Sequence, residues 1–185
     1  MDTVTLVSAC KIGVFKVKKA LLLLVVMTLL SGCVSKNVNS KYSSSDINFA
    51  EMMIPHHEQA IEMSEIALRN TTNPEIVKLA QDIKKAQSPE IALLKSWAGV
   101  HSSSHASHMM EGMLSDDELS DLDQAKDKEF DILFLAGMIK HHEGAIKMAS
   151  EVADSKNIDV VNLSESIIEA QREEIAKMKE LLPKS

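Results

Sequence analysis

The sequence has few residues of three kinds, and each shortage excludes a class of protein. Only two of its 185 residues are cysteine, and both precede residue 34, so the rest of the chain cannot build a disulfide framework. Aromatic residues make up 3% of the chain and β-branched residues do not alternate along it, so strands are not predicted. Lysine and arginine number 20 against 27 acidic residues, which argues against nucleic acid as a partner.

Residues 1–32 are predicted to be a signal peptide. Four lysines precede a short apolar run at residues 20–30, which cannot span a bilayer. The small residues that follow, and Cys33 after them, resemble the bacterial lipoprotein signal, in which this cysteine becomes the lipidated first residue. The alternative is an ordinary signal peptide with a cysteine there by chance. We therefore expect secretion across the inner membrane, as a periplasmic-side or outer-membrane lipoprotein held to the membrane by its lipid anchor.

The mature chain is expected to hold a tether and one folded domain. Residues 33–45 combine the lipidated Cys33 with a flexible stretch rich in serine, asparagine and lysine, and residues 46–183 form the domain. The leader contains four lysines and one aspartate, so its removal changes the net charge from −7 to −10. A surface this acidic favours the recruitment of cations.

An internal repeat is the most informative feature of the chain. Residues 53–63 read MIPHHEQAIEM and residues 138–148 read MIKHHEGAIKM, so eight of eleven positions are identical. Both copies keep a pair of histidines between two methionines. A repeat at this spacing predicts a fold built from two similar halves.

The apolar period from residue 46 onward is helical, and it predicts an all-α, up-down four-helix bundle made of two duplicated hairpins. The first hairpin spans residues 46–98, the connector residues 99–126 and the second hairpin residues 127–183. Asn73 should cap the second helix, and Ser115 with Glu118 should form a capping box that opens a short helix in the connector. Pro55 and Pro89 lie inside predicted helices, where each should kink the helix or free a carbonyl.

Eight polar residues are predicted to form one layer across this bundle, which we call the polar layer. On a helical wheel both histidine pairs flank the buried face, and a Gln and a Glu on each partner helix fall within its apolar stripe. His57 lies about 13 residues before the turn and Gln87 about 13 after it, so their heights coincide. The members of the layer are His56, His57, Gln87, Glu90, His141, His142, Gln171 and Glu174.

Histidine beside methionine indicates a metal site. Imidazole and thioether groups, with no thiol available in an oxidising compartment, favour copper and Cu(I) above all. The glutamines and glutamates could orient the imidazoles or ligate the metal directly. The expected ligands are His56, His57, His141 and His142 with Met52, Met53, Met63, Met138 and Met148. The connector adds an accessory set of His101, His105, His108, Met109, Met110 and Met113.

Simpler interpretations remain open for each of these residues. The histidines could be half-buried groups that only form hydrogen bonds, and the layer could only fix the register of the helices. The methionines could be ordinary core, and the connector a solvated tether. A di-iron site is disfavoured because neither histidine pair stands three residues after a glutamate.

Several segments together resemble a known bacterial family, the domain of unknown function 305 (DUF305). The resemblance covers nearly all of residues 46–182. It implies a ferritin-like four-helix domain outside the cytoplasm, and copper binding and resistance are reported for some members. The segments that carry it are Met53-Ile-Pro-His-His57, Ala86-Gln87 with Glu90-Ile91, Gly112-Met113-Leu-Ser115, Glu129-Phe130-Asp131 and residues 134–145.

Three functions are consistent with the sequence. The leading hypothesis is a lipid-anchored copper-binding protein that sequesters copper or hands it to an unidentified partner protein, without turnover. The second is an oxidoreductase with a dinuclear iron or manganese centre that uses Glu90 and Glu174 with the four histidines. The third is a structural or interaction bundle without metal.

Overall fold

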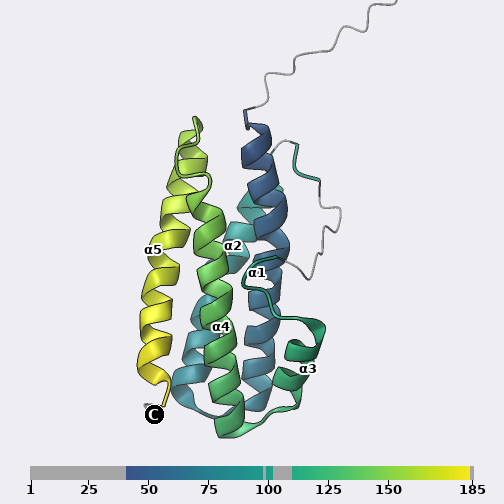
Figure 1. Cartoon of the computed structure of the whole chain (residues 1–185), viewed down its shortest axis with the longest axis vertical. Coiled ribbons are helices and arrows are strands. Elements are labelled where there is room, and N and C mark those ends of the chain that lie inside the picture. The colour runs from purple at the N-terminus through teal and green to yellow at the C-terminus, as the bar shows by residue number, and fades with distance from the viewer. Residues whose placement is uncertain (1–40, 98, 102–109, 184–185) are drawn as a thin grey trace, which may run out of the picture. The chain divides into compact units, whose positions relative to one another are not determined.

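The structure, a computed structural model, describes residues 41–97, 99–101 and 110–183. Within these ranges the chain forms five helices and no strand, which confirms the all-α class (Figure 1). No helix in the described part of the chain is both long enough and apolar enough to span a membrane. The predicted signal peptide and Cys33 lie outside the described residues, as do three of the predicted accessory ligands in the connector: His105, His108 and Met109.

The first two helices begin at side-chain caps. Helix α1 (Ser44–Asn70) opens at a capping box in which Ser43 and Asp46 exchange side-chain and backbone hydrogen bonds. It therefore starts two residues before the predicted boundary at residue 46 and shortens the expected tether. Helix α2 (Pro74–Lys95) opens at Asn73, whose side chain accepts a hydrogen bond from the Glu75 amide, as predicted.

The other three helices follow the expected boundaries. Helix α3 (Asp116–Gln124) is the short connector helix, and Ser115 and Glu118 form the predicted capping box. Helix α4 (Asp127–Ser150) begins at a residue with a φ of 52°. Helix α5 (Ile158–Leu181) ends before Pro183.

Three helix pairs make most of the tertiary contacts. Helix α1 packs against α2, α4 packs against α5, and α1 packs against α4. Helix α3 lies against α1 and α4, at the level of the turn between α1 and α2 (Figure 1). Because each hairpin is continuous in sequence, the contact between α1 and α4 is what brings the two copies of the repeat together.

The apolar core is divided into two clusters, and the polar layer lies between them. The buried apolar residues of α1 up to Ile54 belong to one cluster, and those from Ala60 onward belong to the other. Along α4 the change from one cluster to the other falls between Met138 and Ala145. Helices α2 and α5 change cluster between positions 83 and 91 and between positions 167 and 175. The eight residues of the predicted polar layer occupy these four intervals, between the two apolar clusters.

Two details of the predicted helices need correction. On a helical wheel Leu68 falls about 60° from Met53, so the apolar pattern predicts it on the buried face of α1. It is 40% exposed, because that angle puts it at the edge of the stripe. The expected interruptions at Pro55 and Pro89 are limited, since α1 and α2 each continue through their proline. Each ring still removes one backbone N–H, which frees the carbonyl four residues earlier.

Candidate metal centre

Each hairpin contains one histidine–glutamate pair of the polar layer, which joins the two helices of that hairpin. Nε2 of His57 on α1 lies 2.7 Å from Oε2 of Glu90 on α2, and Nε2 of His142 on α4 lies 2.6 Å from Oε2 of Glu174 on α5. Both imidazoles are fully buried, and both carboxylate side chains are 19% exposed. A carboxylate accepts hydrogen bonds, so each histidine donates from Nε2, and in the neutral form of the ring the lone pair lies on Nδ1.

The other two histidines meet across the two hairpins. The rings of His56 on α1 and His141 on α4 have centroids 3.8 Å apart, and both side chains are fully buried. Nε2 of His56 lies 3.3 Å from the backbone carbonyl oxygen of Glu111, which can only accept. His56 therefore also donates from Nε2 and keeps its lone pair on Nδ1. We call these two residues the central histidine pair.

The inner nitrogens of this layer lack hydrogen-bond partners among the described protein groups. Nδ1 is without a partner in His56, His57, His141 and His142, and Nε2 is also without one in His141. A buried polar atom in this state costs free energy, and native proteins rarely keep several together without a purpose. A neutral imidazole with an exposed lone pair is the form that ligates metal ions.

Burial keeps the central histidine pair neutral. Loss of solvation lowers the pKa of His56 to about 3, with a further contribution from the neighbouring His57, despite the opposing hydrogen bond to Glu111. Loss of solvation also holds the pKa of His141 well below its usual value, with the other three histidines contributing. Both rings are therefore deprotonated at neutral pH, as ligation requires.

The two glutamines of the layer are buried, and some of their amide atoms have no hydrogen-bond partner among the described groups. Gln87 and Gln171 are buried, at 2% and 3% exposure. The number of residues from the turn predicts His57 and Gln87 at the same height in the hairpin. The hydrogen-bond partner of His57 is instead Glu90, one turn further along α2. Both atoms of the Gln87 amide and Oε1 of Gln171 have no partner among the described groups. These amides add further unpaired polar atoms to the same layer.

The predicted methionines fall on both sides of the polar layer. Met53 and Met148 belong to one apolar cluster, and Met63 and Met138 belong to the other. All four are buried, with Met148 the most exposed at 6%. Met52 is half-buried and lines a small pocket of about 30 Å³ with Met148, between α1 and α4. Thioether groups therefore lie above and below the histidines, within the apolar packing.

The four histidines are not assembled as one cluster. Among residues 41–97, 99–101 and 110–183, no three His, Cys, Asp or Glu side chains stand close enough together to hold a metal ion. What the layer offers is the central histidine pair with its free nitrogens. This donor set fits a soft ion that accepts few ligands and binds imidazole and thioether groups, such as Cu(I). It fits a hard ion that needs several carboxylates poorly.

The accessory residues of the connector are only partly described. His101 is exposed, and its backbone amide donates to Oε1 of Glu51. Met110 and Met113 are half-buried on the described side of the connector. His105, His108 and Met109 lie outside the described residues, so the predicted loop site remains a prediction.

One segment of the connector contacts the central histidine pair, which the sequence did not predict. We call residues 110–114 the strap. It supplies the Glu111 carbonyl to His56, and Gln59 on α1 pairs with the backbone of Leu114 through two hydrogen bonds. These contacts use backbone groups of the strap, which leave no pattern in a sequence. The available signal was the position where the repeat differs, Gln59 in one copy and Gly144 in the other.

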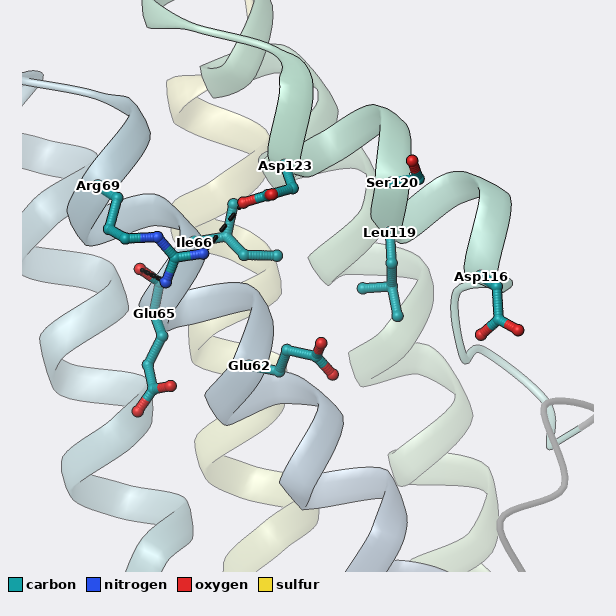
Figure 2. Close-up of a pocket in the computed structure, with 8 residues that line it drawn as sticks. All are labelled: Glu62, Glu65, Ile66, Arg69, Asp116, Leu119, Ser120 and Asp123. Carbon is teal, nitrogen blue, oxygen red and sulfur yellow. Dashed lines mark hydrogen bonds and ion pairs between the residues drawn. The ribbon is translucent and has the colours of Figure 1, made fainter.

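Figure 2 shows a second place where charged side chains gather, a cleft of about 460 Å³ between α1 and α3. Arg69 pairs there with Asp123 at 3.0 Å, and Glu65 pairs with Lys84, which lowers the pKa of Glu65. None of the eight described residues that line the cleft is a histidine or a methionine. The cleft therefore has no soft ligand to offer, and the polar layer remains the candidate metal centre.

Solved structures of proteins with similar sequences resemble this chain in fold. The family model for the domain of unknown function DUF305 matches residues 46–182. A DUF305 protein from Streptomyces coelicolor, described as secreted, is 29% identical, with a TM-score of 0.70 over 74% of this chain and 89% of that one. CopM in its Cu(I)-bound and Cu(II)-bound forms is 35% identical over 74% of this chain and 94% of its own, with TM-scores of 0.62 and 0.65. None of the curated proteins matches the chain.

Proposed function

This chain belongs to the DUF305 family, and we propose that it is an extracytoplasmic protein that binds copper, chiefly as Cu(I), in its polar layer. The protein would sequester copper or pass it to a partner, without catalytic turnover. The central histidine pair would hold the ion, and His57 and His142 would contribute at either side. The observation that carries the proposal is the set of unpaired Nδ1 atoms on four buried histidines.

The solved relatives support a soft metal. CopM, 33–35% identical to this chain, is known in Cu(I)-bound, Cu(II)-bound and Ag-bound forms. Silver and Cu(I) share a preference for thioether and imidazole ligands. The same ligand types fill the polar layer and its surroundings here, where Met53 and Met138 precede His57 and His142 by one helical turn.

The glutamates are assigned a supporting role. A metal-binding histidine usually donates its other ring N–H to a carboxylate, which fixes the tautomer and the ring orientation. Glu90 and Glu174 bond Nε2 of His57 and His142 in this way, and each stays within its own hairpin. A dinuclear iron or manganese centre would need carboxylates shared between ions, so this alternative receives less support.

The remaining parts of the chain fit an anchored protein. We propose a ferritin-like, up-down four-helix bundle over residues 46–183, built from the hairpins 46–98 and 127–183 with the connector 99–126 between them. Residues 1–32 would be removed as a signal peptide, and Cys33 would carry the lipid that holds the domain at the membrane surface. The Streptomyces coelicolor relative, described as secreted, is consistent with export.

Competition titration against a Cu(I) chelator tests the binding site. In a His56→Ala/His141→Ala variant, Cu(I) affinity should fall by on the order of a hundredfold or more, beyond the loss typical of an outer hydrogen-bond partner. The matched control, His105→Ala/His108→Ala, also removes two imidazoles and should lower only the weak capacity, because the serine-rich sequence around them does not predict preorganised ligands. Unchanged tight binding in the first variant would move the site out of the polar layer.

A further inference from the structure

If the central histidine pair binds metal, as proposed above, a route to it must open. The side chains of His56 and His141 are fully buried, so an ion cannot reach them while the described structure stays closed. Helices α1 and α4 flank the pair and are held along their length by the two apolar clusters. The strap, residues 110–114, is a non-helical segment that contacts the pair at His56, through the Glu111 carbonyl oxygen.

The first half of the strap is pressed onto α4 beside the histidines. The Glu111 carbonyl oxygen accepts from His56, and a Cβ added at Gly144 would stand 2.1 Å from that same oxygen. Gly112 has a φ of 87°, and a Cβ there would stand 2.6 Å from the carbonyl oxygen of Lys140. Two glycines therefore allow the strap to lie directly on α4, where larger residues would lift it.

The second half of the strap is anchored on α1. The Leu114 amide donates to Oε1 of Gln59 at 2.8 Å, and Nε2 of Gln59 donates to the Leu114 carbonyl at 3.0 Å. Gln59 and Leu114 are buried, at 5% and 4% exposure. The Glu111 end has only its 3.3 Å bond to His56 and an exposed ion pair with Lys147, which contributes little in water. The strap is thus held firmly at Leu114 and weakly at Glu111.

The internal repeat diverges where this segment binds. Gln59 and Gly144 occupy equivalent positions of the two copies, directly after the shared His-His-Glu. Gln59 forms hydrogen bonds with the strap, and Gly144 lacks the side chain that would clash with it. The two hairpins therefore differ in a way that serves one asymmetric segment.

We propose that the strap is the access cover of the central histidine pair. It opens at Glu111 while Leu114 stays anchored on Gln59, which releases Nε2 of His56 and exposes both rings to an incoming ion. In the closed position it excludes water and chelating molecules from the pair. The rate of metal exchange is then set by the opening of the strap, separately from the affinity of the ligands.

The test compares two glycine-to-alanine substitutions in α4. Gly144→Ala places a methyl group against the Glu111 carbonyl. Gly137→Ala meets no backbone atom of the strap but only the ends of two side chains, Leu114 at 3.2 Å and Met63 at 3.4 Å. Both add the same helix propensity, so the second is a matched control. Gln59→Ala is a further variant, which releases the anchored end without adding bulk. Thermal unfolding and circular dichroism confirm that each variant is folded.

Two readouts separate this proposal from the proposed function. In copper-free protein, carbethoxylation of His56 and His141 by diethyl pyrocarbonate, followed by mass spectrometry, should accelerate on the order of tenfold in Gly144→Ala and Gln59→Ala, the change expected when one or two hydrogen bonds are lost. In Cu(I)-loaded protein, transfer to excess bathocuproine disulfonate should accelerate by a similar factor. Gly137→Ala should match the wild type in both.

Wild-type labelling rates in folded Gly144→Ala and Gln59→Ala would overturn the access-cover proposal even if copper binds tightly. Faster labelling with unchanged copper transfer would also overturn it, because the strap would then not limit exchange. If the wild-type protein binds no copper in titration, the proposed function fails while the labelling result still reports on the strap.

Discussion

At the scale of single residues, the polar layer is defined by which nitrogen of each imidazole is occupied. Glu90, Glu174 and the Glu111 carbonyl each accept from an Nε2–H, so Nδ1 of three histidines is left without a described partner inside the protein. These atoms have lost water and gained no described partner. The unpaired nitrogens therefore lower the free energy of unfolding of the metal-free protein, and a bound metal ion would remove this unfavourable contribution.

The neutral state of the central histidine pair predicts a pH dependence of stability. In the unfolded chain His56 protonates near pH 6.5, whereas in the folded protein its pKa is about 3, and that of His141 is also far below 6.5. Between these values the unfolded state binds more protons, so the free energy of unfolding falls as pH falls. The slope should be about 1.4 kcal/mol per pH unit for each such histidine.

Urea unfolding of the copper-free protein between pH 6.5 and 5 measures this slope, above the range where most carboxylates titrate. A His56→Gln variant should show a shallower slope, since it removes one of the two buried neutral rings. Stability that stays flat across this window would mean that the central pair is solvated and not held neutral by burial.

Replacement of Glu90 and Glu174 together by Gln separates the three candidate functions. The amide keeps the shape of the side chain but removes the charge that orients His57 and His142. Cu(I) affinity should fall about 10–100-fold, as for other outer partners of metal-bound histidines. Loss of an iron or manganese centre would favour the dinuclear enzyme, since hard ions need the carboxylate charge. A more stable copper-free protein with unchanged Cu(I) binding would favour a register role.

At the scale of helices, the caps and apolar stripes were readable from the sequence and the strap was not. Asn73, and Ser115 with Glu118, are local signals whose partners lie two or three residues away, so the starts of α2 and α3 followed from them. The strap depends instead on long-range contacts from Gln59 and Gly144 to backbone groups. Backbone carbonyls and amides are the same in every residue, so the sequence carries no direct sign of them.

A comparison of α2 with its equivalent in the second hairpin, α5, tests whether α2 needs its proline. Pro89 is exposed inside α2, and Glu173 occupies the equivalent place in α5. Pro89→Ala should restore one backbone hydrogen bond and raise the free energy of unfolding by about 1–3 kcal/mol. Glu173→Ala adds the same residue to an intact helix and should change stability little. Urea unfolding of both variants measures the difference, and a destabilised Pro89→Ala would show that α2 requires its proline.

At the scale of the whole molecule, duplication explains most of what the sequence predicted. A shared His-His motif at positions 56–57 and 141–142 placed the polar layer, because equivalent helices of two hairpins present it at equivalent heights. The matching of His57 with Glu90 instead of Gln87 was beyond such reasoning, since one helical turn decides it. Pairing between the hairpins, as in the 3.8 Å contact of His56 with His141, also needed three-dimensional packing.

The proposed anchor makes a prediction for the intact protein. Cys33→Ser should move the protein from the membrane fraction to the soluble fraction, because the mature chain would lose its lipid attachment. One acyl chain binds a membrane only weakly, so mass spectrometry of the wild-type protein should find more than one on Cys33. Fractionation of cells that express each form measures the effect. A cleaved Cys33→Ser protein that stays on the membrane would rule out the lipid anchor.

Anomalous diffraction at the copper edge, from crystals of the Cu(I)-loaded full chain, tests the copper centre most directly. The strongest peak should lie between the imidazoles of His56 and His141, within bonding distance of at least one Nδ1 atom. Such a peak would assign the unpaired nitrogens to metal ligation. A peak confined to the connector histidines or to surface carboxylates, with the polar layer unchanged, would contradict the proposal and leave that layer as a structural element.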